Sequence, residues 1–482
     1  MNLFYLKNKV VFYLASRYVT YAVQFVTSLV IAVELGPYYM GIWGFVMLLL
    51  NYCDKLNFGI AYSFNILYIQ HREDNRECNN YIGNSIVLYG YLAAIIIALF
   101  VAYLIWGVEG FEKYNGHRYM LWICIIAILQ YYSSFIVYLF RVKNLLNQVT
   151  FCQSIVVLLN FICVFIFRGE TLIIALMAGY VIGDLLAIIL AFTSGVIPSF
   201  KSISINRMYQ GKILKKGFLL FLYNSCFYFI IISIRTIISG YYPVEDFGVF
   251  TFSFSLAHAI LLLLEALSFV IFPKIISKLS SPDADEVRDV IGFYREIYIT
   301  SAHFLVYLSL PLFPILVFFF PKYEGAVTTL NLIALSIIVN INSCGYADLL
   351  MARNKERILM KLSFGALILN CVIAMVFVKQ FQVGFSYVII ATLITYIVYS
   401  FSVMAYGEIN LGRKNMCGFM SSYFPLRLAV PYLSALIISL FQFKGLCVII
   451  PLVFFLILNK RTIGLIKETV IKVLSRPEVV NL

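Results

Sequence analysis

Long apolar stretches separated by short polar segments run through the whole chain. About fourteen of them reach the roughly 20 residues that a helix needs to cross a bilayer. None alternates between apolar and polar at every second position, so the pattern predicts helices rather than the strands of a closed barrel. The predicted spans are 11–33, 41–65, 83–106, 118–140, 149–167, 171–193, 216–238, 247–272, 297–320, 326–350, 358–378, 384–406, 424–441 and 445–459. Several are short and closely spaced, and twelve spans is the alternative count.

The composition agrees with a membrane protein. Of the 482 residues, 62% are hydrophobic and 12% are charged, and the mean hydropathy is +0.93. Soluble domains contain about a quarter charged residues. We therefore expect an all-α integral membrane protein of about 14 transmembrane helices, whose first apolar stretch is a retained span rather than a cleaved signal peptide.

Basic residues are distributed unevenly between the two sets of loops. With the N-terminus placed in the cytoplasm, about 27 lysines and arginines fall on the cytoplasmic side and about six on the other, as the positive-inside rule requires. Both termini are then predicted to be cytoplasmic. The same asymmetry accounts for the net charge of +13, which we interpret as topology and contact with an anionic leaflet rather than nucleic-acid binding.

The sequence lacks the nucleotide-binding and metal-binding motifs that many enzymes carry. The sequence contains no GxxxxGK[ST] for nucleotide phosphates and no HExxH for zinc. The four histidines are scattered, and the ten cysteines form no CxxC pair. We therefore expect a protein that is not an enzyme and holds no metal, and whose function lies between its helices.

A weak internal repeat occurs at two helix entries. The segments LGPYYMGIWGF (35–45) and GYYPVEDFGVFTF (240–252) align Gly41 with Gly248. Six predicted spans separate them, which indicates a parallel repeat about the membrane normal, although chance similarity of two turns is the alternative. The expected organisation is a six-helix half in each of 1–200 and 201–410, followed by two additional helices and a short cytoplasmic tail in 411–482.

The first predicted span carries a polar stripe. Tyr21, Gln24 and Ser28 follow Arg17 at intervals of four, seven and eleven residues, so all four lie on one helical face. A stripe of this kind is typical of a helix that lines a wet cavity. The alternative is that Arg17 extends to the cytoplasmic headgroups.

Asp54 and Lys55 fall near the middle of the second predicted span. Adjacent residues on a helix point about 100° apart, so we expect the two charges to pair poorly with each other and at least one to face a cavity. The alternative is a break of the helix over Asn57–Gly59, with the charges close to the cytoplasmic surface.

Three further spans carry polar or charged residues. Asn224 and Arg235 share a face of the seventh, where an extension of Arg235 to the headgroups is the alternative to a cavity position. His258 and Glu265 lie on one stripe of the eighth, and Glu265 could pair with a basic residue of the first half, although a packed His258 is the bland alternative. Asp184 lies beside Gly183 in the sixth, where it could instead cap a local break.

Basic residues on the first, second and seventh spans predict a cavity that favours an anionic substrate, because arginine binds phosphate through two parallel hydrogen bonds. The candidate substrate-binding residues are Arg17, Tyr21, Gln24, Lys55, Asn224 and Arg235. The candidate coupling or charge partners are Asp54, His258, Glu265 and Asp184.

Two segments resemble a known family. YYPVEDFGVFTFSFSLAHAILLLLEALSFVIFPKII (241–276) and ELGPYYMGIWGFVMLLLNYCDKLNFGIAYS (34–63) are similar to the matching helix entries of bacterial O-antigen and polysaccharide flippases. These belong to the multidrug/oligosaccharidyl-lipid/polysaccharide (MOP) exporter superfamily. Members often carry an acidic residue beside the basic one near the end of the seventh helix; here that neighbour is Ile234, with Arg235 retained.

The resemblance implies a flippase in lipopolysaccharide or other polysaccharide biosynthesis. Such a protein moves undecaprenyl-pyrophosphate-linked oligosaccharide repeat units from the cytoplasmic to the periplasmic leaflet of the inner membrane by alternating access. It would contact membrane lipids and other polysaccharide assembly proteins, and a gradient of H⁺ or Na⁺ could drive it. The rival functions are a cation-coupled multidrug antiporter of the same superfamily, a membrane-embedded polysaccharide polymerase and a scaffolding protein.

Overall fold

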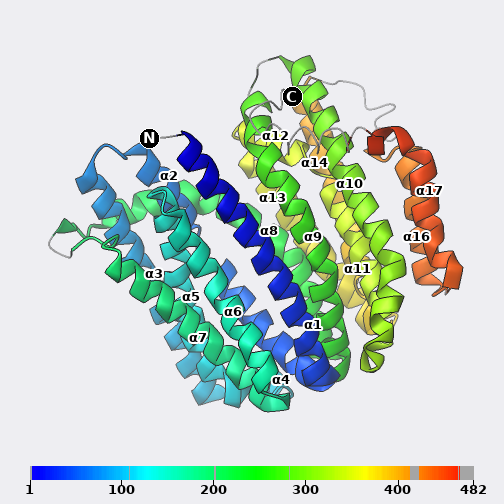
Figure 1. The fold of residues 1–482 in the computed structure, drawn as a ribbon, viewed down its shortest axis with the longest axis horizontal. Coiled ribbons are helices and arrows are strands. Elements are labelled where there is room, and N and C mark those ends of the chain that lie inside the picture. The colour runs from blue at the N-terminus through cyan, green and yellow to red at the C-terminus, as the bar shows by residue number, and fades with distance from the viewer. Residues whose placement is uncertain are drawn as a thin grey trace. The chain divides into compact units, whose positions relative to one another are not determined.

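The chain forms helices in two separate units (Figure 1). The computed structural model describes residues 3–107, 109–199, 202–279, 281, 283–412, 423–443, 445–464 and 466; for 3–15, 109, 220 and 260–277 it describes the backbone alone. The first unit comprises Met1–Ser225 with Tyr242–Gly248, and the second comprises Cys226–Tyr241 with Val249–Leu482. The predicted limits of the repeated halves stay a prediction.

The first unit is an all-helical bundle. In Figure 1, α3, α5, α6 and α7 run side by side within it, and α5 contacts α1, α3, α6 and α7. It includes the beginnings of α8 and α9, both of which end in the second unit. Its elements are α1 (Leu3–Lys55), α2 (Ile60–Gln70), α3 (Asn75–Trp106), α4 (Glu109–Glu112), α5 (Gly116–Val142), α6 (Leu146–Ile166), α7 (Gly169–Thr193), α8 (Arg207–Tyr241) and α9 (Val244–Leu279).

The second unit contains the rest of the chain. Within it α10 and α14 both pack on α11, and α16 packs on α17. Its further elements are α10 (Ala284–Phe318), η2 (Pro321–Tyr323), α11 (Ala326–Ile341), α12 (Tyr346–Ala352), α13 (Glu356–Lys379), η3 (Phe385–Tyr387), α14 (Ile390–Asn410), α16 (Leu426–Leu440), η4 (Gly445–Ile449) and α17 (Ile450–Leu458).

Many of these helices can cross a membrane. Within the described residues, nine are long and apolar enough, or ten if α11 and α12, which meet at a bend of 43°, count as one span. One of the nine, Ser16–Gln70, overlaps the predicted span 11–33 and contains the span 41–65, and α16 and the pair η4–α17 are shorter apolar helices. The prediction of an all-α multi-pass protein is confirmed, while the number fourteen stays a prediction.

A kink divides α1 into two legs. Gly36 has a φ of 64° and a ψ of 175°, a conformation that side-chain-bearing residues avoid, and Pro37 follows it inside the helix. The sequence predicts a turn between two spans at this place. The kink therefore separates the residues before Gly36, including Arg17, from the leg that ends at Lys55.

The second leg of α1 meets the start of α9 without space for side chains. A Cβ atom on Gly41 would lie 2.1 Å from the carbonyl oxygen of Val244, and one on Gly248 would lie 1.8 Å from that of Pro37. Both distances are far below van der Waals contact, so the helix backbones touch only because both residues are glycine. The two glycines that the repeat aligns thus lie against each other in the first unit.

Candidate substrate pocket in the first unit

A helix break inside a predicted span creates the polar site. The helix α1 ends at Lys55, Phe58 and Gly59 adopt positive φ values of 50° and 70°, and α2 begins at Ile60. Asn57 holds the break, because its Nδ2 donates to the Asp54 carbonyl oxygen at 2.8 Å and its Oδ1 accepts from the Gly59 N–H at 2.9 Å. The sequence alternative of a break over Asn57–Gly59 is confirmed.

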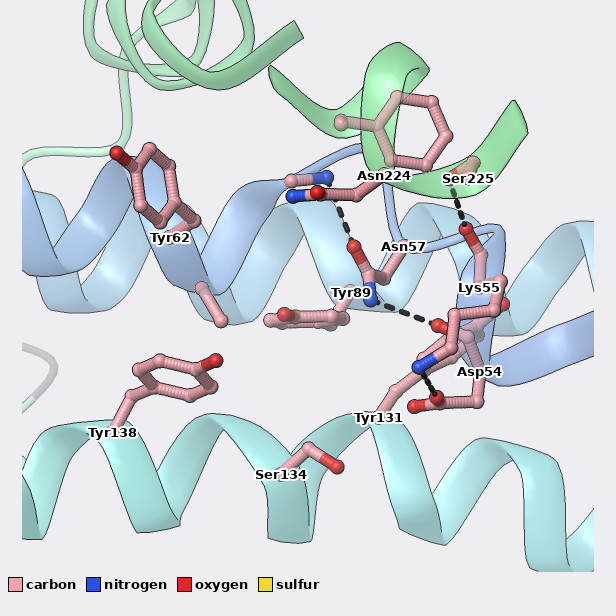
Figure 2. Close-up of a pocket in the computed structure, with 13 residues that line it drawn as sticks. Asp54, Lys55, Asn57, Tyr62, Tyr89, Tyr131, Ser134, Tyr138, Asn224 and Ser225 are labelled. Atoms are coloured by element: carbon pink, nitrogen blue, oxygen red, sulfur yellow. Dashed lines mark hydrogen bonds and ion pairs between the residues drawn. The ribbon is translucent and has the colours of Figure 1, made fainter. Parts of the chain in front are cut away.

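A cavity of about 350 Å³ opens at this break. Figure 2 shows Asp54 and Lys55 at one end, Tyr62 and Tyr138 at the other, and the ring of Tyr89 between them. The lining comes from α1, α2, α3, α5 and α8 and consists of Asp54, Lys55, Asn57, Gly59, Ala61, Tyr62, Tyr89, Tyr131, Ser134, Tyr138, Phe221, Asn224 and Ser225. All of these residues belong to the first unit.

Asp54 and Lys55 form an ion pair in the cavity. The Lys55 Nζ lies 2.8 Å from the Asp54 Oδ2, and the side chains of Lys55 and Asp54 are 36% and 40% exposed (Figure 2). The prediction that these neighbours would pair poorly is wrong. Both residues lie in the last turn of α1, where the long lysine side chain turns back onto its neighbour. The pair brings one charge of each sign to the pocket.

Four tyrosines give the cavity aromatic walls. Tyr89 and Tyr131 are buried, with ring centroids 5.7 Å apart. The Tyr131 hydroxyl donates to the Cys53 carbonyl oxygen at 2.8 Å, which fixes α5 against the end of α1. Tyr62 is 42% exposed. A site that combines aromatic faces with a few placed polar groups is suited to an organic molecule that is apolar on its faces and polar at its edges.

The structure brings together three of the residues that the sequence singles out. Asp54, Lys55 and Asn224 line the same cavity. The neighbour of Asn224, Ser225, donates to the Lys55 carbonyl oxygen at 3.2 Å. The sequence analysis named Asn57 only as part of a helix break, and it missed the pocket residues Tyr89, Tyr131, Ser134 and Tyr138. The available signal was a polar stripe on one face of α5, where the last three follow one another at intervals of three and four residues.

Arg17, Tyr21 and Gln24 lie on the first leg of α1, and none of them lines the cavity. Arg17 Nη2 donates to the Tyr21 hydroxyl at 2.8 Å, and its guanidinium carbon lies 4.6 Å from the centroid of the Tyr21 ring. The predicted common face of these two residues is therefore confirmed. Gln24 is exposed. Their part in substrate binding stays a prediction.

Arg235 and His258 belong to the second unit. Arg235 is only 3% exposed, and its guanidinium carbon lies 4.8 Å from the centroid of the Phe254 ring. The side chain does not reach the surface, so the alternative that it extends to the headgroups is wrong. His258 Nδ1 lies 3.0 Å from the Phe254 carbonyl oxygen. The side chain of Glu265 lies outside the described residues, so its predicted pairing is not visible.

Asp184 is a buried carboxylate of the first unit. It is 7% exposed, and its Oδ1 accepts from the Ser133 hydroxyl at 2.7 Å. Its Oδ2 has no hydrogen-bond partner among the described residues. The helix α7 runs unbroken from Gly169 to Thr193 through this position, so the alternative that Asp184 caps a break is wrong.

A second charged cavity, of about 220 Å³, lies within the second unit. Arg295 donates to the carbonyl oxygens of Asn342 and Cys344 at 2.5 and 3.0 Å. The Tyr346 hydroxyl donates to Glu408 Oε1 at 2.5 Å. The charged residues of its lining are Arg288, Arg295, Glu296, Glu408 and Arg427. The sequence analysis had used these arginines only as a sign of topology.

Comparison with known proteins identifies the fold of this chain. No protein family and no curated protein matches the sequence. Among solved structures, the lipid II flippase MurJ in an inward closed conformation matches with a TM-score of 0.68 and 14% identity, covering 96% of this chain and 100% of that chain. An inward-facing multidrug resistance MATE family transporter matches with a TM-score of 0.62 and 13% identity, covering 83% and 98%.

A MOP superfamily transporter from Pyrococcus furiosus, described by the reverse polarity of its binding pocket, matches with a TM-score of 0.56 and 13% identity, covering 84% and 96%. At these identities the likeness establishes the fold. The chain is an all-helical multi-pass membrane protein with the fold of the MATE transporters and MurJ, and the proteins it matches are transporters and flippases rather than enzymes.

Proposed function

We propose that the protein is a MOP superfamily flippase. Its substrate is an undecaprenyl-pyrophosphate-linked oligosaccharide repeat unit of O-antigen or a similar polysaccharide. It moves this unit from the cytoplasmic to the periplasmic leaflet of the inner membrane by alternating access. The shared fold with MurJ and MATE transporters and the resemblance of the two helix entries support this proposal.

The observation that carries the proposal is the lining of the pocket at the α1–α2 break. Sugar rings have apolar C–H faces and polar rims, and tyrosine rings with amides and hydroxyls nearby match both features. The Lys55 ammonium can bind a phosphate group, although it forms an ion pair with Asp54 in this structure. Apart from the tyrosines, six of the 13 lining residues are polar or charged. A pocket for a hydrophobic drug would need fewer hydrogen-bonding groups.

The second candidate is a cation-coupled multidrug or small-molecule antiporter, which the MATE matches favour. Coupling to H⁺ or Na⁺ fits either function. Asp184 is our candidate for the coupling group, because a buried carboxylate with one oxygen unpartnered among the described residues can take up a proton or a monovalent cation. Coupling alone therefore does not separate the two functions, whereas the substrate does.

The test is translocation of a lipid-linked oligosaccharide in reconstituted vesicles, with the substrate extracted from cells that make O-antigen. Wild type is compared with Tyr138→Ala, which removes a pocket wall, and with the control Tyr91→Ala, which removes an exposed tyrosine outside the pocket. We expect transport by wild type and by the control, and a loss of about tenfold in Tyr138→Ala. Efflux of cationic drugs without oligosaccharide transport would instead establish the antiporter.

Arg17→Ala and Arg17→Lys extend the same assay to the first leg of α1. Loss of transport with alanine and partial recovery with lysine at equal protein incorporation would assign a phosphate-binding role to Arg17. Full activity in both variants would leave that role to Lys55 and Arg235.

A further inference from the structure

An apolar groove of about 450 Å³ lies in the first unit and opens on its outer surface. Its rim is exposed within helices that can cross the membrane: Leu56, Leu99 and Trp106 are 44%, 65% and 81% exposed. The groove lies between α1 and α3, with α5 as its floor, and is lined by Leu49, Tyr52, Cys53, Leu56, Ile96, Leu99, Phe100, Ala102, Tyr103, Trp106, Gly107, Phe111, Met120, Ile123, Cys124 and Ala127.

The groove and the polar pocket follow one another along a single face of α5. Met120, Ile123, Cys124 and Ala127 line the groove, whereas Tyr131, Ser134 and Tyr138 line the pocket. These residues are three, four or one apart, the spacing of one helical face, and they span about 27 Å of helix. One side of α5 therefore changes from apolar to polar part of the way along.

The helix α3 repeats the same division. Tyr89 lines the pocket, and residues from Ile96 to Gly107 line the groove. At the end of α1, Cys53 and Leu56 line the groove, whereas Asp54 and Lys55 line the pocket, so the two cavities adjoin at the helix break. Three helices thus contribute residues to both cavities, and we refer to the groove and the adjoining pocket together as the track.

The ion pair lies at this boundary. Figure 2 places Asp54 and Lys55 at one end of the pocket and Tyr62 and Tyr138 at the other. Because Cys53 lines the groove, the charged end of the pocket is the end that adjoins the groove. Along the track the order is hydrocarbon surface, paired charges, then aromatic and hydroxyl groups. A lipid that carries a sugar through a phosphate has its parts in the same order.

We propose that this track binds the carrier lipid, with the hydrocarbon chain in the groove, the phosphate at Lys55 and the first sugar against Tyr62 and Tyr138. The phosphate then replaces Asp54 as the partner of Lys55. The identity of the lipid rests on the proposed function, whereas the binding of a chain in the groove does not. A chain bound here lies in the first unit and runs parallel to α3 and α5.

Trp106 lines the groove, so its fluorescence can be used to detect a chain bound there. The chain has 3 tryptophans, so Trp43→Phe with Trp122→Phe leaves Trp106 as the sole indole. The probe is an undecyl maltoside with a dibrominated chain, added to the protein in phospholipid nanodiscs. We expect saturable quenching of Trp106 fluorescence, reversed by undecaprenyl phosphate but not by maltose or glycerol phosphate, which have no chain.

Two alanines on α3 provide the matched variants. Ala102→Phe fills the groove, whereas Ala98→Phe adds the same side chain at an exposed position outside it. We expect Ala102→Phe to weaken the binding of both the maltoside and undecaprenyl phosphate about tenfold, and Ala98→Phe to leave both unchanged. Quenching that rises linearly with probe, is not reversed, and is equal in the two variants would mean ordinary bilayer contact and would overturn the proposal.

Oligosaccharide translocation by Ala102→Phe and Ala98→Phe in the native tryptophan background is the second measurement, because Trp43 is buried and its replacement can affect folding. Equal transport by both variants would refute the groove while leaving the flippase function intact. The opposite result is also informative. If the quenching is saturable and depends on the groove, but the wild type transports no oligosaccharide, the flippase function is refuted and the groove remains a binding site for a hydrocarbon chain.

Discussion

The Asp54–Lys55 pair of the first cavity and the charges of Arg295 and Glu408 in the second cavity are held in different ways. In the first unit, Asp54 and Lys55 pair with each other and keep 40% and 36% of their side-chain surface exposed. In the second unit, Arg295 is held by backbone carbonyl oxygens, and Glu408 is only 4% exposed. A charge whose partner is an exposed neighbour can exchange it for a ligand, whereas a charge fixed by backbone and burial stabilises the fold. We therefore expect Arg295 and Glu408 to stabilise the fold, and the Asp54–Lys55 pair to be available for the proposed substrate.

Replacing one basic residue of each cavity by methionine gives the largest expected difference in the free energy of unfolding. Arg295→Met leaves the Asn342 and Cys344 carbonyl oxygens without their donor, and we expect a loss of about 3 kcal/mol in the free energy of unfolding. Lys55→Met removes a partly exposed pair and should cost less than about 1 kcal/mol. Thermal unfolding in detergent measures both. Equal losses in the two variants would remove the distinction between the cavities.

Lys55→Met, which we expect to have little effect on stability, should have a large effect on substrate affinity. Lys55→Met is expected to weaken the binding of undecaprenyl phosphate about tenfold, because a charge-assisted hydrogen bond to phosphate is lost. The control is Lys379→Met, which removes a lysine outside the pocket in the second unit. Competition against the brominated maltoside measures the affinity. An unchanged affinity in Lys55→Met would contradict the assignment of Lys55 to the phosphate.

Asp54→Asn tests whether the pair can be exchanged. The amide keeps the size of the side chain but removes the negative charge with which Lys55 pairs, so undecaprenyl phosphate should bind a few times more tightly. The uncharged maltoside should bind as it does to wild type, which serves as the internal control. Weaker binding of the phosphate would mean that the carboxylate itself contacts the lipid.

The smallest expected effect is the change in transport rate on replacing Asp184. The hydrogen-bond partner of this carboxylate is the hydroxyl of Ser133 and not a basic side chain. Asp184→Asn keeps the hydrogen bond with Ser133 but cannot take up a proton or bind a cation through a charge. We expect transport to continue at a rate a few times lower and to lose its dependence on an imposed H⁺ or Na⁺ gradient. Ser133→Ala is the control, since it removes the hydrogen bond and keeps the charge. Gradient-driven transport in Asp184→Asn would place coupling elsewhere.

The sequence was sufficient for the fold class and for several local features. Hydropathy and period predict membrane-spanning helices, and the structure confirms the all-α class. The alignment of Gly41 with Gly248 picked out two residues that prove to touch. The break over Asn57–Gly59 was visible because asparagine and glycine favour positive φ and local hydrogen bonds. Each of these features depends on the residue type and its immediate neighbours.

The composition of the site depended on the tertiary structure. A polar stripe shows which residues share one face of a helix but not which other face it meets, so Tyr89 of α3, Tyr131 of α5 and Asn224 of α8 gave no sign that they enclose one pocket. Arg235 looked like Lys55 in the sequence, yet one is buried on Phe254 and the other lines a cavity. Hydropathy and helical period are local properties of the chain, whereas a cavity exists only where several helices, each rotated by its packing, leave space between them.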